Sequence, residues 1–297
     1  MGELQAGFEI EYDELTMPGN EILVVILGLS SAFSWGAGDF SGGMASKRTS
    51  AYSVVVISQF ISLLLLLAGV YLVSPEPIFS QAVLLGGIGG ICSAVGLVAL
   101  YSGLARGPMG VVAPLTAVTA AVVPVVFSQW ESGLPTITQM FGILVALVAV
   151  WTISSGDGIT RLQLKDLGLP MLAGLGFGLF YIVIARASEE SAIWPLVFAR
   201  SSSVIFILAI AILLGRFETA LRGSLLLIAL AGIFDTAGNL LYIFATRYGR
   251  LDIAAVLSSF YPAATVFLAW VILKEKLTRR QWVGVMLVIL AVVLIAI

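Results

Sequence analysis

The sequence has no histidine and a single cysteine, Cys92. Histidine-based catalysis, zinc sites and internal disulfide bonds are therefore excluded. Charged residues are scarce at 11% of the chain, whereas ordinary soluble domains contain about 25%. The GxxxxGK[ST] pattern of a nucleotide-binding loop is also absent, so the chain cannot use ATP by itself. Without histidine, a hydrolytic site other than a pair of aspartates would need a serine–lysine pair, and no lysine lies inside an apolar run.

Apolar residues take the place of charged ones. They make up 60% of the 297 positions, and the mean hydropathy is +1.08, which predicts an integral membrane protein. Ten apolar runs are long enough to cross a bilayer, and because they are continuous rather than alternating, they predict helices and exclude a β-barrel. The runs cover residues 22–44, 52–73, 79–105, 110–130, 137–155, 167–187, 194–214, 223–248, 252–273 and 280–297. We expect an all-α, multi-pass protein of the cell membrane, inner or plasma.

The ten runs form two copies of a five-helix unit. A shift of 142 residues aligns Gly90 with Gly232 and Gly96 with Gly238, and the register continues to the end of the chain. Because five is odd, the second copy must enter the membrane from the opposite side, as in the inverted repeats of many transporters. We predict repeats over residues 22–155 and 167–297, joined by a linker over 156–166.

The N-terminal segment, residues 1–21, holds six of the seventeen acidic residues and lacks the pattern of a signal peptide. We expect an acidic arm that is mostly disordered or forms a short surface helix. Eleven lysines and arginines fall in connections on the side opposite the N-terminus, against three on the N-terminal side. The positive-inside rule therefore places both termini outside the cell.

Three segments resemble the drug/metabolite transporter superfamily, specifically its EamA-type ten-helix branch. They are SSAFSWGAGDFSGG over residues 30–43, ATRYGRLDIAAVLSSFYP over 245–262 and KEKLTRRQWVGVMLVILAVVLI over 274–295. The resemblance implies a central cavity between the two halves and transport of amino acids or other metabolites. It also implies cytoplasmic termini, in conflict with the distribution of lysine and arginine.

One carboxylate, Asp235, lies near the middle of the eighth run, about half way across the bilayer core. An ionisable residue at that depth costs about 2.5–3.5 kcal/mol and is a functional candidate by default. Asn239 and Tyr242 follow at i+4 and i+7 and share its face of the helix. Asp235 is either a structural acid, protonated or paired with arginine, or a cavity group that carries a proton or faces a cationic substrate. The shared polar face favours a cavity group.

Arg200 and Gln59 are further polar candidates inside the apolar runs. Arg200 lies near the start of the seventh run, within reach of Asp235. A pair between them would lower the cost of both charges, and opening the pair would couple binding to movement. Alternatively, Arg200 extends to the lipid headgroups. Gln59 either binds substrate or links helices.

Asp39 and Trp35 share a stripe on the first run, one helical turn apart. We expect Asp39 within a turn of the helix end, far from Arg200 and at a different depth from Asp235, either as a gate or cavity rim or as an interfacial acid. Trp35 is either an aromatic wall for substrate or a packing residue. Tyr181 shares a thin face of the sixth run with two glycines, and that face is a candidate border of the cavity.

Prolines fall inside equivalent runs of the two halves, Pro114 and Pro124 in the fourth and Pro262 in the ninth. Proline removes a backbone donor and disrupts a helix. Interrupted segments in corresponding positions indicate a transporter site. Ser258 and Tyr261 beside the second break are therefore candidate binding residues, although kinks also serve packing.

These features predict a secondary active transporter of a small metabolite, an amino acid or related zwitterion or an organic cation. It would work by alternating access as an exporter or a proton-coupled carrier. The expected partners are the substrate, protons and the lipid bilayer; we expect no nucleic acid, cofactor or metal, and a monomer or homodimer.

The alternative is an intramembrane aspartyl protease. Residues 36–39 match its GxGD motif, and Asp235 would supply the second acid. Against this hypothesis, GxGD comes first in the chain, no tyrosine precedes Asp235, and the two acids are expected at different depths.

Overall fold

The computed structural model describes residues 20–73, 80–106, 109–128, 135–154, 164–189, 191–218, 222–273 and 279–296. These residues form helices joined by short connections, and no β-strand occurs among them. The all-α prediction is therefore confirmed for the described part of the chain. The acidic arm expected over 1–21 and the linker expected over 156–166 lie almost entirely outside the described residues.

The helices begin and end where charged and turn-forming residues interrupt the apolar runs. They are α1 (Asn20–Ser46), α2 (Ala51–Val73), α3 (Ser80–Arg106), α4 (Met109–Ser128), α5 (Ile137–Ser154), α6 (Leu164–Ala187), α7 (Ile193–Leu213), α8 (Leu225–Tyr248), α9 (Leu251–Ser258), α10 (Tyr261–Leu273) and α11 (Arg279–Ala296), with a 3-10 turn, η2 (Arg222–Ser224), before α8. The run predicted over 252–273 is divided between α9 and α10. The described chain thus has eleven α-helices where the sequence predicts ten.

Six helical segments of the described chain are long and apolar enough to cross a membrane. They are Ile22–Ser46, Ala51–Leu72, Val83–Ala105, Gly168–Ala187, Ile193–Leu213 and Leu225–Tyr248. Two shorter apolar stretches, Thr116–Phe127 and Ile137–Ala149, belong to α4 and α5. The protein is therefore a multi-pass membrane protein, while ten crossings and an inverted arrangement of the halves remain predictions.

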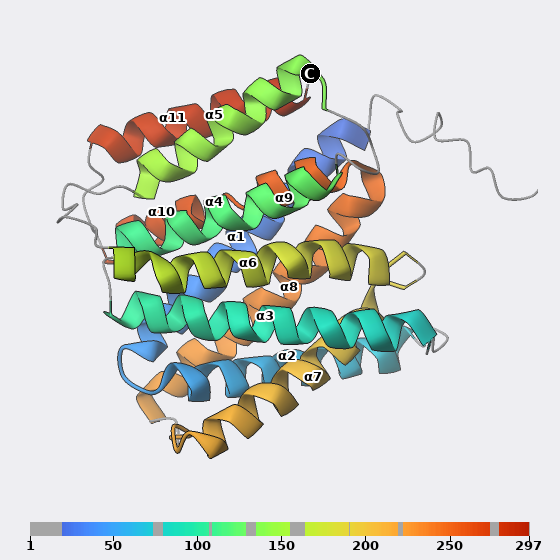
Figure 1. Cartoon of the computed structure of the whole chain (residues 1–297), viewed down its shortest axis with the longest axis vertical. Helices are drawn as coiled ribbons and strands as arrows, with labels where there is room; N and C mark the ends of the chain where they lie inside the picture. The colour runs from blue at the N-terminus through green and yellow to red at the C-terminus, as the bar shows by residue number, and fades with distance from the viewer. Residues whose placement is uncertain are drawn as a thin grey trace, which may run out of the picture.

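The helices lie side by side, with α5 and α11 at one end of the molecule and α2 and α7 at the other (Figure 1). Helices that are far apart in the sequence pack together: α1 against α8, α3 against α6 and α7, and α5 against α11. Each of these contacts joins a helix of the first predicted repeat to one of the second. The two halves therefore share an extensive interface, and a site between them draws side chains from both.

The break between α9 and α10 falls at Ser259 and Phe260. The N–H of Ser259 donates to the carbonyl of Ala255 at 2.9 Å and closes α9. Pro262, the second residue of α10, has no N–H with which to continue the hydrogen-bond ladder. The predicted interruption at Pro262 is thus confirmed.

The interruption predicted in the fourth run is wrong. α4 continues from Met109 to Ser128 through both of its prolines. A membrane helix tolerates proline where neighbouring helices and local adjustments compensate for the lost hydrogen bond. Proline in a corresponding position therefore did not suffice to break the helix in both halves.

Candidate functional site

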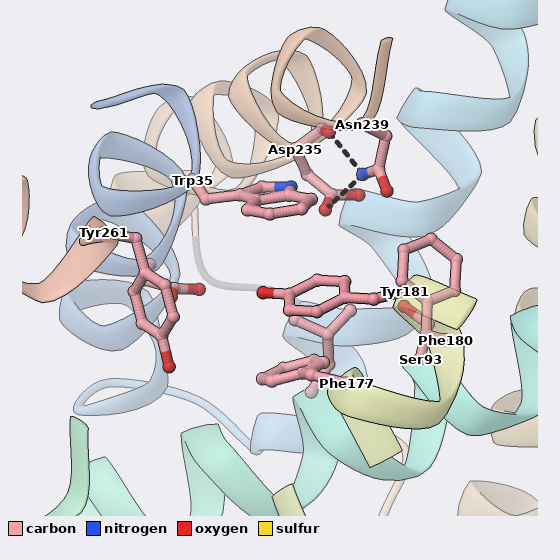
Figure 2. Close-up of a pocket in the computed structure, with 10 residues that line it drawn as sticks. Trp35, Ser93, Phe177, Phe180, Tyr181, Asp235, Asn239 and Tyr261 are labelled. Carbon is pink, nitrogen blue, oxygen red and sulfur yellow. Dashed lines mark hydrogen bonds between the residues drawn. The ribbon is translucent and has the colours of Figure 1, made fainter. Parts of the chain in front are cut away.

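A pocket lies between α1, α3, α6, α8 and α10 (Figure 2). Its lining combines carboxylates and an amide with aromatic rings: Trp35, Asp39, Ser93, Leu97, Phe177, Phe180, Tyr181, Asp235, Asn239 and Tyr261. The empty space, including the part that is open to solvent, is about 370 Å³. A ligand held there must therefore be small.

The structure brings six of the ten sequence-predicted site residues to this pocket. The six are Trp35, Asp39, Tyr181, Asp235, Asn239 and Tyr261. The other four, Gln59, Arg200, Tyr242 and Ser258, do not line it and are buried in the surrounding protein.

α8 places Asp235 and Asn239 on the pocket wall. The Asn239 side-chain amide donates to the backbone carbonyl of Asp235 at 2.6 Å and to its Oδ1 at 3.0 Å (Figure 2). Tyr242, further along the same face, is fully buried and donates its hydroxyl to the carbonyl of Tyr181 at 3.1 Å. The polar face predicted on this helix is therefore real, but only its first two residues reach the pocket.

Arg200 and Asp235 form an ion pair between α7 and α8, with Nη2 of Arg200 2.9 Å from Oδ2 of Asp235. Gln59 on α2 contacts both partners. Its Oε1 accepts a hydrogen bond from Nη1 of Arg200 at 2.6 Å, and its Nε2 donates to Oδ2 of Asp235 at 3.0 Å. The predicted pair is confirmed, and Gln59 links three helices.

The alternative in which Arg200 extends to the lipid headgroups is wrong. Its side chain is fully buried. Nη1 lies 3.5 Å from Oγ of Ser93, and the guanidinium lies 6.0 Å from the ring centre of Phe180. Arg200 thus stands behind the pocket wall that Ser93 and Phe180 form, and it reaches the site through Asp235.

The predicted position of Asp39 is also wrong. α1 continues to Ser46, so Asp39 lies about two turns from the helix end instead of within one. Gly38 on α1 faces α8, and a Cβ atom at that position would make an ordinary contact, 3.5 Å from the backbone nitrogen of Asp235. Asp39 and Asp235 consequently line one pocket instead of lying at different depths.

Trp35 forms part of an aromatic cluster at the pocket. Its ring stacks on Tyr181, with centroids 5.3 Å apart and an interplanar angle of 15°, as Figure 2 shows. Tyr242 packs behind both rings, 5.7 Å from Trp35 and 5.0 Å from Tyr181. Trp35 is therefore a packing residue and a wall of the pocket at once.

The two candidates beside the α9–α10 break have different surroundings. Ser258 is fully buried, and its Oγ lies 3.5 Å from the carbonyl of Gly28, away from the pocket. Tyr261 lines the pocket, and its buried hydroxyl has no hydrogen-bond partner within the described chain. The same holds for Oδ1 of Asn239. Two buried polar atoms of the lining are therefore available to a ligand.

Four lining residues escaped the sequence analysis: Ser93, Leu97, Phe177 and Phe180. Ser93 and Leu97 are ordinary residues of an apolar helix and gave no signal. Phe177 precedes Tyr181 by one helical turn, so the face of Tyr181 would have indicated it.

The described residues include no group of three His, Cys, Asp or Glu side chains that could hold a metal ion. An aspartyl protease site is not supported either. Such a site needs two carboxylates that share a proton, whereas Oδ2 of Asp235 is occupied by Arg200 and Gln59. The GxGD glycines have a packing role instead: Gly36 faces the backbone of α10 and Gly38 that of α8.

Known proteins resemble this chain in sequence and in structure. The family model of the EamA-like transporter family matches residues 166–297. An uncharacterized protein of Methanocaldococcus jannaschii is 28% identical over 134 residues, which are 44% of this chain and 94% of that protein. A solved crystal structure of a protein superposes with a TM-score of 0.74 at 15% identity, covering 91% of this chain and 95% of that chain. This last likeness shows the fold alone.

The matched residues 166–297 contain α7 and α8, and with them both partners of the Arg200–Asp235 ion pair. The resemblance stated from the sequence is therefore confirmed over this part of the chain: residues 166–297 match the model of the EamA-like transporter family, a family of the drug/metabolite transporter superfamily.

Proposed function

We propose that this protein is a secondary active transporter that moves a small metabolite through the pocket between its halves by alternating access. The substrate is an amino acid or related zwitterion, or an organic cation. The protein acts as an exporter or a proton-coupled carrier of the inner or plasma membrane, as a monomer or homodimer. Asp39 and Asp235 are the candidate proton carriers.

The Arg200–Asp235 pair at the pocket wall carries this proposal. The Arg200 side chain is fully buried and that of Asp235 is 17% exposed, and both lie in candidate membrane spans. Charges at that depth are costly, and in membrane proteins they mark substrate or ion pathways. A substrate group that competes for Asp235 would weaken the link between α7 and α8. Binding would then favour one arrangement of the helices over another.

The helix boundaries support a relation between the two halves. α2, α4 and α5 begin at residues 51, 109 and 137, and α7, α9 and α11 begin at 193, 251 and 279. Each pair is separated by 142 residues, the shift found in the sequence. Under the same shift, α1 corresponds to α6, and α3 corresponds to α8. The contact between α1 and α8 therefore has a counterpart in the contact between α6 and α3, and both contacts are present. Many transporters that work by alternating access are built from such a pair of similar halves.

The test is neutralisation of the ion pair in proteoliposomes. Asp235→Asn leaves the buried Arg200 without its counter-charge, and we expect a loss of stability of roughly 3–5 kcal/mol together with loss of transport. The double variant Arg200→Gln, Asp235→Asn removes both charges and should regain most of the stability. Transport should stay absent in the double variant, measured as flux of radiolabelled amino acids and amines.

Two outcomes would contradict the proposed role of the Arg200–Asp235 pair in transport. If the double variant transports like the parent chain, the ion pair is structural only. If the parent chain moves no solute of these classes under any gradient of protons or substrate, the proposal of a transporter for them fails.

A further inference from the structure

The charges at the pocket do not balance. Two carboxylates, Asp39 and Asp235, line it, and Arg200 pairs with Asp235 at 2.9 Å. Asp39 has no hydrogen-bonding or ionic partner within the described chain. When Asp39 is ionised, no charged group of the described chain compensates its negative charge.

Aromatic rings surround that charge. Trp35, Phe177, Phe180, Tyr181 and Tyr261 contribute to the same lining, from α1, α6 and α10. The faces of aromatic rings attract cations, and a carboxylate among aromatic rings is a suitable environment for an alkylammonium group. Neither the carboxylate nor the faces of the aromatic rings attract an anion.

Two buried polar atoms of the pocket lining have no hydrogen-bond partner among the described residues. Asn239 and Tyr261 are each 2% exposed, and Oδ1 of Asn239 and the hydroxyl of Tyr261 make no hydrogen bond to the described residues. The amide nitrogen of Asn239 already donates to Asp235, and Oδ1, a carbonyl oxygen, is a hydrogen-bond acceptor. Leaving such atoms unpaired is costly, and an N–H group of a ligand would satisfy Oδ1.

The same lining offers little to a ligand carboxylate. Arg200 does not line the pocket, and its guanidinium is held by Gln59 and Asp235. The hydroxyl of Tyr261 is the remaining donor among the buried unpaired lining atoms. The carboxylate of Asp39, when ionised, would repel a ligand carboxylate.

We infer that the pocket binds a small organic monocation, a protonated amine carrying an apolar group, through Asp39 and the aromatic rings beside it. This inference rests on the transport function proposed above and narrows its substrate class. Asp39 contacts the ammonium group, Oδ1 of Asn239 accepts one of its hydrogens, and the apolar group lies among the rings. Asp235, already engaged by Arg200, is a positioning residue for Asn239.

The experiment compares three probes of similar shape that differ in charge, titrated by calorimetry into the purified full-length protein in detergent. The probes are phenethylamine, a cation; phenylalanine, a zwitterion; and phenylpropionate, an anion. We expect phenethylamine to bind at least about tenfold more tightly than the other two, and Asp39→Asn to lose at least about tenfold of that affinity. Asp39→Glu should retain the preference for the cation.

Glu189→Gln is the matched control, because it removes an exposed carboxylate outside the pocket. It should bind phenethylamine like the parent chain. Thermal melting of each variant checks the fold. Asp39→Asn removes a charge without a protein partner, so its midpoint should equal or exceed that of the parent.

Absence of phenethylamine binding, equal or tighter binding of the zwitterion or the anion, or full binding by a folded Asp39→Asn variant would each overturn the inference. Binding in detergent needs no gradient, so it is independent of flux. Cation binding without any flux contradicts the transport proposal alone. Flux of zwitterions without a preference for cations contradicts only the inference about Asp39.

Discussion

One of the close contacts at the pocket involves a glycine. A Cβ atom on Gly238 would lie 2.5 Å from Cδ1 of Trp35, well inside ordinary contact distance. Gly238→Ala must therefore displace the Trp35 ring from its stack with Tyr181. We expect a loss of stability of roughly 1–3 kcal/mol, typical of overpacking, and weaker ligand binding. Thermal melting and calorimetry measure the two effects.

Gly69→Ala serves as the control for that substitution. Gly69 lies in α2, and no atom stands within 4 Å of the position its Cβ would take. Alanine is the better helix former by up to about 1 kcal/mol, so this variant should melt at the same temperature or higher. Equal melting of the two alanine variants would contradict the assignment of Gly238 as a contact that positions Trp35.

Single site residues were predictable from the sequence where a polar or charged side chain interrupts an apolar helix, because burying such a group in lipid is costly. Asp235, Asn239 and Arg200 were found in this way, and the ion pair was one of two alternatives for Arg200, based on the reach of its side chain. Asp39 was misplaced because its position depends on where α1 ends and on how α1 packs against α8. Both are properties of tertiary packing. Ser93 had no local signal at all.

At the scale of the helix, the α9–α10 break holds Tyr261 at the pocket. Pro262→Ala restores an N–H in the first turn of α10 and allows α9 and α10 to join into one helix. Tyr261 would then rotate away from the lining. We expect transport to fall about tenfold, corresponding to ~1.4 kcal/mol, with the melting temperature unchanged or raised.

Pro124→Ala is the matched comparison for the break. Pro124 lies in α4, which is continuous, so its replacement alters no interruption and should leave flux in proteoliposomes close to that of the parent. Full transport by Pro262→Ala would show that the break has no part in function. The different behaviour of the prolines also shows why only one of the two predicted breaks occurs in the structure: neighbouring helices decide whether the lost hydrogen bond is compensated.

At the scale of the whole molecule, the predicted inverted repeats of five crossings each would place the middle of the chain on the opposite side of the membrane from both ends. Single cysteines test this arrangement in a Cys92→Ser background. We expect Asp157→Cys to react with a membrane-impermeant maleimide from one side of the membrane, and Gly2→Cys and Ile297→Cys to react from the other. Labelling of all three from one side would contradict inverted repeats.

The sequence predicted the helices well because apolar runs and their boundaries are local properties, visible in any single chain. The 142-residue shift also predicted which helices correspond. It could not predict that helices of opposite halves would pack as extensively as α1 on α8 or α5 on α11, since such pairing depends on surfaces that no linear pattern describes. The pocket arises from that pairing and was accordingly only partly foreseen.

The order of the partners along the chain has a consequence for biosynthesis. The ribosome releases α7 with Arg200 before α8 with Asp235, so for an interval the guanidinium enters the membrane without its carboxylate. Gln59 on α2 has been inserted by then, and its side-chain oxygen accepts from Arg200 at 2.6 Å in the finished protein. The Gln59 amide can therefore accept a hydrogen bond from the guanidinium before Asp235 has been synthesised. We expect a nascent chain stalled after α7 to depend on Gln59 for membrane insertion far more than the completed protein does.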